Sequence, residues 1–325
     1  TKIPLNIMKN IIRKITPRFL LGWYHLGLAF LGAALYGFPS RKLIVIGVTG
    51  TKGKTTTCNL IAQILNLAGL KTGMATTVNF RIGEKEWINT TKQTMLGRFK
   101  LQQLLAQMLK EGCKYAVIET SSEGILQHRH RFIDYKTAVF TNLYPEHIER
   151  HGGFENYRAA KLKLFEKVAR KKDGIGIYNL DDDNVKYFLQ YPIQKKYGYT
   201  LQANQGEHSQ VVKIEDCKLA TGGTEFKIGS TTFRTQLLGT FNIYNAAAAV
   251  CVALSQGMPM EKIKEVLARA KPAPGRLELV DVGQNFKVVV DYSYEPTSLE
   301  NALKTLKIFN PSKIIVVFGS AAGGR

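Results

Sequence analysis

Glycine, lysine and threonine recur together in the segment Gly50-x-x-Gly53-Lys54-Thr55. Consecutive backbone N–H groups in such a glycine-rich turn can bind phosphate oxygens, and the positive end of a following helix adds to their attraction for an anion. A lysine supplies a point charge, and a threonine hydroxyl can ligate a metal ion beside the phosphates. The segment therefore predicts a binding site for a nucleoside triphosphate.

The residues on either side supply the elements that such a loop requires. Residues 43–48 are an apolar run of the kind found in a strand buried on both faces. After the loop, Leu60, Ile61, Ile64 and Leu65 follow helical spacing until Gly69. We therefore expect a strand, a phosphate-binding turn and a helix in succession.

Further apolar segments alternate with helical patterns along the chain. The expected strands cover residues 114–120, 137–143 and 174–179, and the expected helices cover 97–112 and 154–169. This alternation predicts an α/β fold with a parallel sheet covered on both faces. Short strands with glycine-containing turns are expected over residues 195–236, followed by a helix over 242–256.

A proline-rich segment, residues 271–275, is the expected linker to a second domain. Beyond it, residues 286–292, 298–309 and 313–319 suggest a strand, a helix and a strand. We expect an N-terminal basic and apolar segment (1–41), a P-loop-type ATP-binding central domain with a parallel sheet (42–271) and the start of a Rossmann-like C-terminal domain (272–325). Because two strands do not close a domain, the sequence is interpreted as a fragment.

Polar side chains stand where the expected strands end. Glu119 ends one strand, while Asn142 and His147 follow the next. Ligands of open parallel sheets bind beyond the carboxyl ends of the strands. Glu119, His147 and Thr55 are therefore expected to converge on Mg²⁺ beside the nucleotide phosphates.

Composition sets the wider context. The four cysteines form no C-x-x-C pair, which favours a reducing, cytosolic environment over a disulfide framework or a zinc site. The formal net charge is +20, but lysine and arginine are spread along the whole chain. No RNA-binding signature accompanies this charge, so no nucleic-acid partner is expected. A nucleic-acid-binding ATPase is the alternative from a different functional class.

The N-terminal segment has its own signature. Residues 19–38 carry no formal charge and are long enough, as a helix, to span a bilayer. A span would place the five basic residues before it on the far side of the membrane from the ATP site, against the positive-inside tendency. We therefore predict a helix in the interface on the inner face of the membrane. Packing on a partner or on the domain itself is the alternative.

Seven colinear segments resemble the Mur ligases of peptidoglycan synthesis, in particular the tripeptide-synthetase branch. They are GTKGKTTT (50–57), NTT (89–91), ETSSEGILQHR (119–129), TNLYPEHIERHGGFENYRAAK (141–161), GTFNIYNAAAA (239–249), PGRLE (274–278) and DYSYEP (291–296). The resemblance implies a cytoplasmic, ATP- and Mg²⁺-dependent ligase that adds an amino acid to a muramyl-peptide acceptor. The γ-phosphoryl group would activate a carboxylate as an acyl phosphate, which the amine of the amino acid then attacks.

The resemblance also assigns roles to individual residues. It implies that the catalytic residues are Lys54, His147 and Lys161, and that Lys161 is carbamylated. The implied metal ligands are Thr55, Glu119, His147 and carbamylated Lys161. The implied ATP-binding residues are Gly50, Thr51, Lys52, Gly53, Lys54, Thr55, Thr56, Asn142, Asn242, Asn245, Arg276 and Asp291. The implied acceptor-binding residues are Thr90, Thr91, Ser121, Gln127 and Arg129.

Several features depart from the family pattern. Lys52 replaces the asparagine that is frequent in the loop, and Phe241 replaces a frequent histidine before Asn242. The family's N-terminal uridine-binding domain has no counterpart in the sequence, so the acceptor is expected to be either UDP-linked or lipid-linked. Alternatives within the superfamily are ligases of the folylpolyglutamate-synthetase, cyanophycin-synthetase and muramyl-amidating types.

Overall fold

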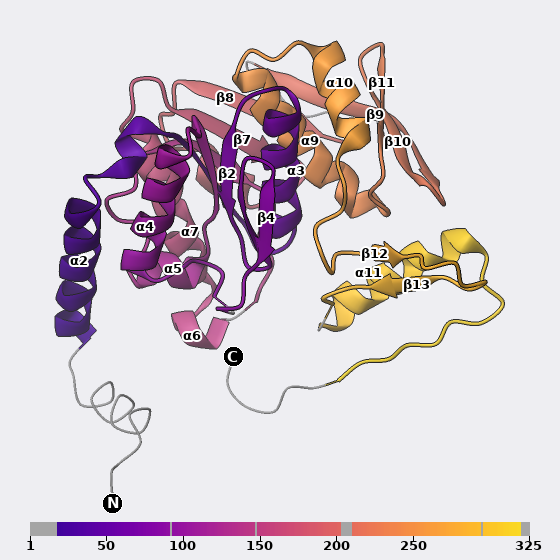
Figure 1. Cartoon of the computed structure of the whole chain (residues 1–325), viewed down its shortest axis with the longest axis horizontal. Coiled ribbons are helices and arrows are strands. Elements are labelled where there is room, and N and C mark those ends of the chain that lie inside the picture. Colours follow the sequence, from indigo (N-terminus) through magenta and orange to yellow (C-terminus); the bar gives the residue numbers. More distant parts are fainter. Residues whose placement is uncertain (1–17, 92, 147, 203–209, 294, 320–325) are drawn as a thin grey trace, which may run out of the picture.

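A single large sheet runs through the centre of the molecule (Figure 1). The structure is a computed structural model, and it describes residues 18–91, 93–146, 148–202, 210–293 and 295–319. Within these residues the sheet has eleven strands in the order β11-β10-β9-β8-β7-β6-β1-β5-β2-β3-β4. The order places β1, the strand before the phosphate loop, near the middle of the sheet.

The central strands are parallel, as the alternating pattern predicted. They are β2 (Thr72–Ala75), β5 (Tyr115–Glu119), β1 (Ile44–Thr49), β6 (Tyr135–Phe140), β7 (Ile175–Asn179), β8 (Lys195–Thr200) and β9 (Val211–Ala220). Antiparallel strands complete both edges: β3 (Asn79–Ile82) and β4 (Lys85–Ile88) at one, and β10 (Gly223–Ile228) and β11 (Thr231–Thr235) at the other. The parallel order brings the carboxyl ends of β1, β5 and β6 to one edge, where the phosphate loop lies.

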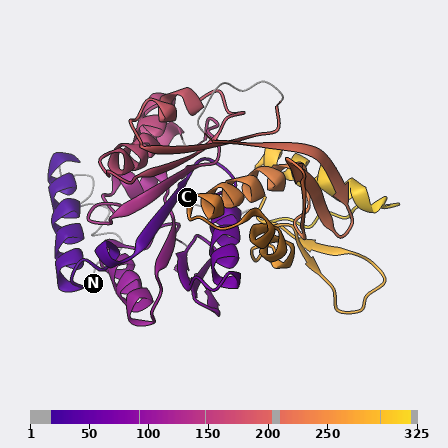
Figure 2. The same ribbon diagram turned by 90° about the horizontal axis from the view of Figure 1, so that it is seen from above.

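Helices cover both faces of this sheet and create two apolar cores (Figure 2). One core includes α3 (Lys54–Leu67), α9 (Thr240–Ser255) and α10 (Met260–Arg269). The other includes α4 (Arg98–Lys110), α7 (Phe154–Ala169) and α8 (Val185–Leu189). Near-continuous burial of the central strands follows from this two-sided cover.

Smaller helices flank the sheet. The short helix α5 (Ser122–Leu126) follows β5, and α6 (Ile148–His151) precedes α7. The predicted N-terminal helix is present as α2 (Arg18–Leu35), and the 3₁₀ turn η1 (Pro39–Lys42) connects it to β1. One face of α2 packs on α4, so closely that a Cβ on Gly32 would lie 3.3 Å from the Cα of Phe99. Along the described chain, no helix is both long and apolar enough to cross a membrane.

The C-terminal part is smaller and lies beside the end of the sheet that carries β10 and β11 (Figures 1 and 2). It contains an antiparallel pair, β12 (Glu278–Val280) and β13 (Val288–Val290), then α11 (Pro296–Leu306) and the 3₁₀ turn η2 (Lys307–Phe309). The strand predicted over residues 313–319 is wrong: this segment forms no ladder, and Val317 and Phe318 are 93% and 81% exposed. A strand needs a hydrogen-bonded neighbour, and this segment has none among the described residues.

Candidate active site

The phosphate loop connects β1 to α3, and its glycines are required by geometry. Gly50 and Gly53 have φ angles of 147° and 79°, which favour glycine. A side chain at Gly50 would collide with the Thr141 hydroxyl, and one at Gly53 would collide with the Asn245 amide. The backbone therefore takes this shape only with glycine at both positions.

The residues after β6 hold the loop in place. The Thr51 N–H donates to the Asn142 carbonyl (2.9 Å), and the Lys52 N–H donates to Asn142 Oδ1 (2.8 Å). The Thr141 hydroxyl donates to the Lys52 carbonyl (2.8 Å). Asn142 thus supports the phosphate loop from the neighbouring strand end, and its ATP-binding role stays a prediction.

Two lysines lie against the loop. Lys54 Nζ donates to the Thr51 carbonyl (2.7 Å), and Lys161 Nζ, from the middle of α7, donates to the Gly50 carbonyl (2.6 Å). The Lys161 side chain is buried, and burial, with the nearby Lys54 charge, holds its pKa well below the usual lysine range. Burial also lowers the pKa of Lys54. Two amines therefore meet where phosphate oxygens would bind.

Glu119 occupies the end of β5 and faces the start of α3. Its Oε2 accepts hydrogen bonds from the Thr55 hydroxyl (2.9 Å) and the Thr77 N–H (2.8 Å). A carboxylate and a hydroxyl side by side are the oxygen donors that Mg²⁺ prefers, so this pair fits the predicted metal site. His147 lies outside the described residues. Within those residues, no three His, Cys, Asp or Glu side chains gather as a metal cluster.

Lys52 links the loop to the C-terminal part. Its ammonium pairs with Glu146 (3.2 Å) and with Glu295 (2.5 Å), the residue that precedes α11. Burial and the neighbouring Glu146 carboxylate raise the pKa of Glu295. The departure from asparagine at position 52 thus provides an ion pair between the two parts of the chain.

The two asparagines of α9 support the first turn of α3, which lies in the same core as α9. Asn245 Oδ1 accepts from the Thr57 hydroxyl (3.1 Å), and its Nδ2 donates to Asn242 Oδ1 (2.8 Å). Asn242 in turn donates to the Leu238 carbonyl (2.8 Å). Both side chains are buried, as is Thr56 in the first turn of α3. The adenine-binding role of the asparagines stays a prediction.

Arg276 and Asp291 occupy the junction with the C-terminal part. The Arg276 guanidinium lies 4.8 Å from the ring centroid of Tyr292, and its charge contributes to the lowered pKa of Lys54. Asp291 accepts hydrogen bonds from the N–H groups of Leu277 (2.8 Å) and Ser293 (2.9 Å). Asp291 therefore shapes the junction, whereas Arg276 lies within electrostatic reach of the loop.

Most of the predicted acceptor residues gather at one place. Arg129 donates to Gln127 Oε1 (2.7 Å) and to Gln93 Oε1 (3.0 Å), and Thr91 donates to Asn89 Oδ1 (2.6 Å). A cavity of about 290 Å³ adjoins them, lined by Leu28, Thr91, Gln93, Leu96, Gly97, Arg98, Phe99 and Lys100. Ser121 instead caps α5, accepting from the Gly124 N–H (3.1 Å), and Thr90 is exposed.

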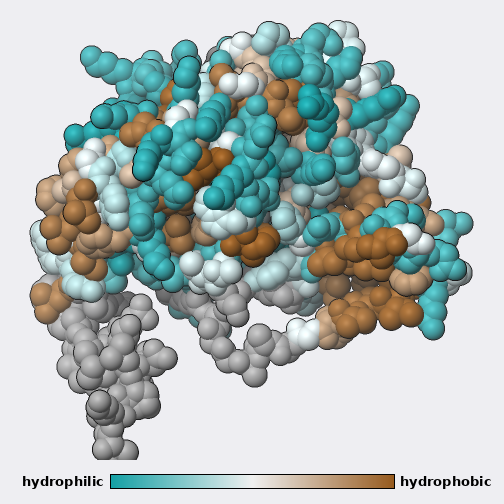
Figure 3. Space-filling view, in the orientation of Figure 1, coloured by the Kyte–Doolittle hydropathy of each residue, from teal (hydrophilic) through white to brown (hydrophobic). Residues whose placement is uncertain are grey.

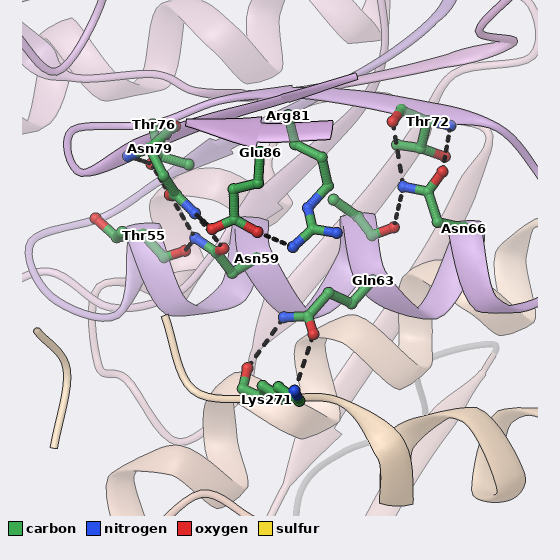
Figure 4. Close-up of polar contacts among 11 residues, drawn as sticks. Thr55, Asn59, Gln63, Asn66, Thr72, Thr76, Asn79, Arg81, Glu86 and Lys271 are labelled. Atoms are coloured by element: carbon green, nitrogen blue, oxygen red, sulfur yellow. Dashed lines mark hydrogen bonds and ion pairs between the residues drawn. The ribbon is translucent and has the colours of Figure 1, made fainter. Parts of the chain in front are cut away.

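A polar network along α3 has no counterpart in the sequence-based prediction (Figure 4). Asn59 exchanges hydrogen bonds with Asn79 (3.1 and 2.8 Å) and donates to the Thr55 carbonyl (3.0 Å). Gln63 donates to the Lys271 carbonyl and accepts from the Lys271 N–H, both at 3.0 Å. The available signal was the spacing of Asn59, Gln63 and Asn66, which places three amides on one side of an otherwise apolar helix.

This loop and its supporting residues match a known family. The model of the Mur ligase middle domain matches residues 48–253, and that of the Mur ligase glutamate ligase domain matches residues 275–324. The chain belongs to the Mur ligase family.

Individual relatives agree with this assignment. The chain is 38% identical over 302 residues to a UDP-N-acetylmuramoyl-L-alanyl-D-glutamate–2,6-diaminopimelate ligase of Geobacillus kaustophilus. It is 36% identical over 310 residues to a UDP-N-acetylmuramyl-tripeptide synthetase of Roseiflexus sp.. Each match covers 90% of this chain and 60% of the relative. The chain thus spans about 60% of the length of these relatives.

Solved structures agree on the fold. One of a UDP-N-acetylmuramoyl-L-alanyl-D-glutamate–2,6-diaminopimelate ligase has a TM-score of 0.70 and 31% identity, over 82% of this chain and 54% of that one. The folylpolyglutamate synthase of Mycobacterium tuberculosis has a TM-score of 0.68 at 17% identity, over 86% and 70% of the two chains, and this likeness concerns the fold alone.

Proposed function

We propose that this chain forms the ATP-binding part of a ligase that joins an amino acid to a muramyl-peptide acceptor in peptidoglycan synthesis. The observation that carries the proposal is the convergence of Lys54, Glu119 and Lys161 on a glycine-shaped phosphate loop. The Mur ligase family uses ATP, which agrees with that loop. The muramyl-peptide acceptor is proposed from the names of the relatives.

The chemistry follows from what the loop can do. A carboxylate is a poor electrophile, and transfer of the γ-phosphoryl group from ATP converts it into an acyl phosphate with a good leaving group. The amine of the amino acid then attacks the carbonyl carbon, the amide forms, and ADP and phosphate leave. Because charge accumulates on phosphoryl oxygens, fixed donors and cations lower the barrier. Lys54 and the loop N–H groups supply them here.

Metal binding is part of the proposal. Thr55 and Glu119 would hold Mg²⁺, which would neutralise charge on the phosphates. We further propose that Lys161 is carbamylated, since an ammonium beside a divalent cation is repelled whereas a carbamate offers oxygen donors. A lowered pKa agrees with this, because only the neutral amine reacts with CO₂.

We assign acceptor binding to the cavity that Thr91 and Gln93 line. Arg129, held by Gln127 and Gln93, would face the anionic part of the acceptor, and Thr91 lines the same cavity. Leu28 of α2 also lines it, so the N-terminal helix forms part of the wall. We infer that the enzyme works in the cytoplasm, where ATP is available, on a UDP-linked or membrane-linked acceptor.

Nucleotide binding by this chain tests the proposal directly. Lys54→Ala is expected to weaken Mg·ATP binding at least tenfold, because it removes a positive charge held against the phosphate loop. Isothermal titration calorimetry on the 325-residue chain measures the affinity. Lys42→Ala, an exposed lysine at the opposite end of β1, is the matched control and should bind within twofold of wild type.

Turnover is tested in the complete protein with UDP-muramyl dipeptide and a screen of amino acids. Amino-acid-dependent phosphate release, lost in Lys54→Ala, is the expected result. Unchanged ATP affinity in a folded Lys54→Ala variant would refute the phosphate-loop assignment. Phosphate release that depends on folate and glutamate would show that the acceptor is a folate and not a muramyl peptide.

A further inference from the structure

The outward face of α2 is apolar from Leu20 to Leu35. Residues 19–35 include no Asp, Glu, Lys or Arg. The inner face, with Ala29, Gly32 and Ala33, packs on the rest of the chain. The outer face consists of large apolar side chains, with these exposed fractions: Leu20 48%, Trp23 71%, Tyr24 60%, Phe30 49%, Leu31 56% and Leu35 70%.

These exposed residues form one stripe. At 100° per residue, they fall within an arc of about 140°, and Gly27 and Ala34 complete it. A helix on the surface of a protein in water normally carries charged residues on its outer face, and a contiguous apolar patch marks an interaction site. In Figure 3 apolar residues line the edge of the molecule where α2 lies, and a second, larger apolar area covers the C-terminal part at the lower right. The stripe is therefore a candidate interaction surface.

The surroundings of this stripe are basic. The Phe30 ring packs edge-on against Phe132 (5.4 Å between centroids), at the end of the turn that carries Arg131. Burial, together with the charges of Lys167, Arg131 and Lys163, lowers the pKa of the buried His130 in that turn to about 3. No Asp or Glu occurs in the sequence before Glu84.

We propose that the outward face of α2 docks on an anionic lipid bilayer. The helix lies in the plane of the membrane, with its aromatic side chains at the boundary between headgroups and acyl chains, where tryptophan and tyrosine are favoured. Lysines and arginines beside it attract anionic headgroups. A second copy of the chain is disfavoured as the occupant, because it would bring two basic surfaces and two net charges of +20 together.

Trp23 provides the readout. The chain has two tryptophans, so Trp87→Phe leaves Trp23 as the only fluorophore of its kind, on the proposed docking face. We expect its emission to shift to the blue on vesicles of phosphatidylglycerol and phosphatidylcholine. We also expect the whole chain to co-sediment with these vesicles at least tenfold more strongly than with pure phosphatidylcholine.

Two matched pairs of substitutions locate the surface. In the Trp87→Phe background, Leu31→Gln with Leu35→Gln should reduce binding to the anionic vesicles at least tenfold. Val282→Gln with Phe286→Gln, which changes equally exposed apolar residues (85% and 63%) near β12 and β13, should leave binding within twofold. All four positions are on the surface, so the fold is expected to persist.

Three results would overturn the proposal. One is the absence of both a blue shift and co-sedimentation on anionic vesicles. Another is an equal loss of binding in the two matched pairs, which would indicate non-specific adhesion. The third is a dimer, seen by light scattering, that dissociates in the α2 pair while neither form binds vesicles. Vesicle binding is measured without ATP or acceptor, so its result is independent of the proposed ligase activity. ATP affinity is tested in a separate experiment.

Discussion

Lys161 combines two properties that seldom occur together, since its side chain is buried and its amine touches a loop that would bind anions. A buried lysine without a paired carboxylate is costly to keep charged, so the surrounding protein favours the neutral amine. The described partners of Nζ are the Gly50 carbonyl and the Tyr157 ring. Lys161 is thus suited to chemical modification.

The proposal that Lys161 is carbamylated predicts a loss of turnover without a matching loss of ATP affinity. Lys161→Ala in the complete protein should reduce turnover at least 100-fold while ATP affinity changes by less than about fivefold, because metal geometry is lost and the phosphate loop remains. A short carboxylic acid in the buffer should restore part of the activity. Lys163→Ala, an exposed lysine on the same helix, is the control. Near-normal turnover in Lys161→Ala would contradict a catalytic role.

Lys167, six residues further along α7, supports a prediction about stability. Burial and the neighbouring Arg131 lower its pKa to about 8, against an unfolded value of 10.5. Below pH 8 the lysine is charged in both the folded and the unfolded state, and burial of that charge destabilises the folded state. As the pH rises from 8 to 10.5 the folded state loses the proton first, so stability increases with pH.

Replacing Lys167 by methionine should remove this cost. At pH 7, Lys167→Met is expected to be more stable by about 1–2 kcal/mol, less than the full shift implies because the side chain is partly exposed. The difference should vanish by pH 10.5. Urea unfolding at both pH values measures it, with Lys163→Met as the exposed control. A destabilised variant at pH 7 would contradict the assignment.

At the scale of residues, the sequence predicted the phosphate loop better than the side-chain contacts that hold the loop and the junction in place. Gly50, Gly53 and Asn142 were identified because turn chemistry and strand ends are local signals. The partners of Asp291 were not, because its contact with the Leu277 N–H forms only when β12 and β13 pair. The two asparagines of α9 were placed near the nucleotide, but their contacts with the loop depend on the packing of α9 against α3.

Among the elements, α3 does more than follow the phosphate loop. Its apolar side fills the core, while its amides bond to the β2–β3 region and to the linker (Figure 4). A glutamine side chain paired with both backbone groups of Lys271 replaces the hydrogen bonds of a neighbouring strand. The helix that presents Thr55 therefore also fixes the start of the linker.

Gln63→Ala tests this link. Loss of both hydrogen bonds should destabilise the chain by about 1–2 kcal/mol, because the backbone groups of Lys271 are left without these partners. Gln63→Glu keeps one acceptor and the size of the side chain but places a buried carboxylate oxygen against the Lys271 carbonyl, so it should be destabilised as well. Urea unfolding measures both, and limited proteolysis after Lys271 should be faster in Gln63→Ala. Equal stability of the variant and the wild type would exclude a structural role for the pair.

Helices and strands were predicted more accurately where their apolar periodicity was stronger. The helix over residues 154–169 was predicted with the bounds that α7 has, and the strands before and after it were found within a few residues. The short antiparallel strands β3 and β4 were missed because four residues carry too little pattern. Residues 313–319 show the reverse error, since an apolar run becomes a strand only beside a partner.

At the scale of the molecule, neither of the two large apolar cores includes a residue of α2. Removal of residues 1–37 should therefore leave a folded chain that binds ATP within twofold of the intact one. The turn at Ser40, which bonds to Phe132 and Asp134, is retained. The thermal midpoint should fall by a few degrees, about 2–6 °C, since Phe99 and Phe132 lose their cover. Loss of cooperative unfolding in calorimetry would show that α2 belongs to the core.

The position of α2 has a mechanical consequence. Figures 1 and 2 place it at one side of the molecule and the C-terminal part at the opposite side. When one side of a protein is attached to a membrane, the opposite side is the part that can move most. The linker after residue 271 leads to that opposite part, and the Lys52–Glu295 ion pair connects it to the phosphate loop. Anchoring through α2 would therefore hold the acceptor cavity, whose wall includes Leu28 of α2, next to the point of attachment.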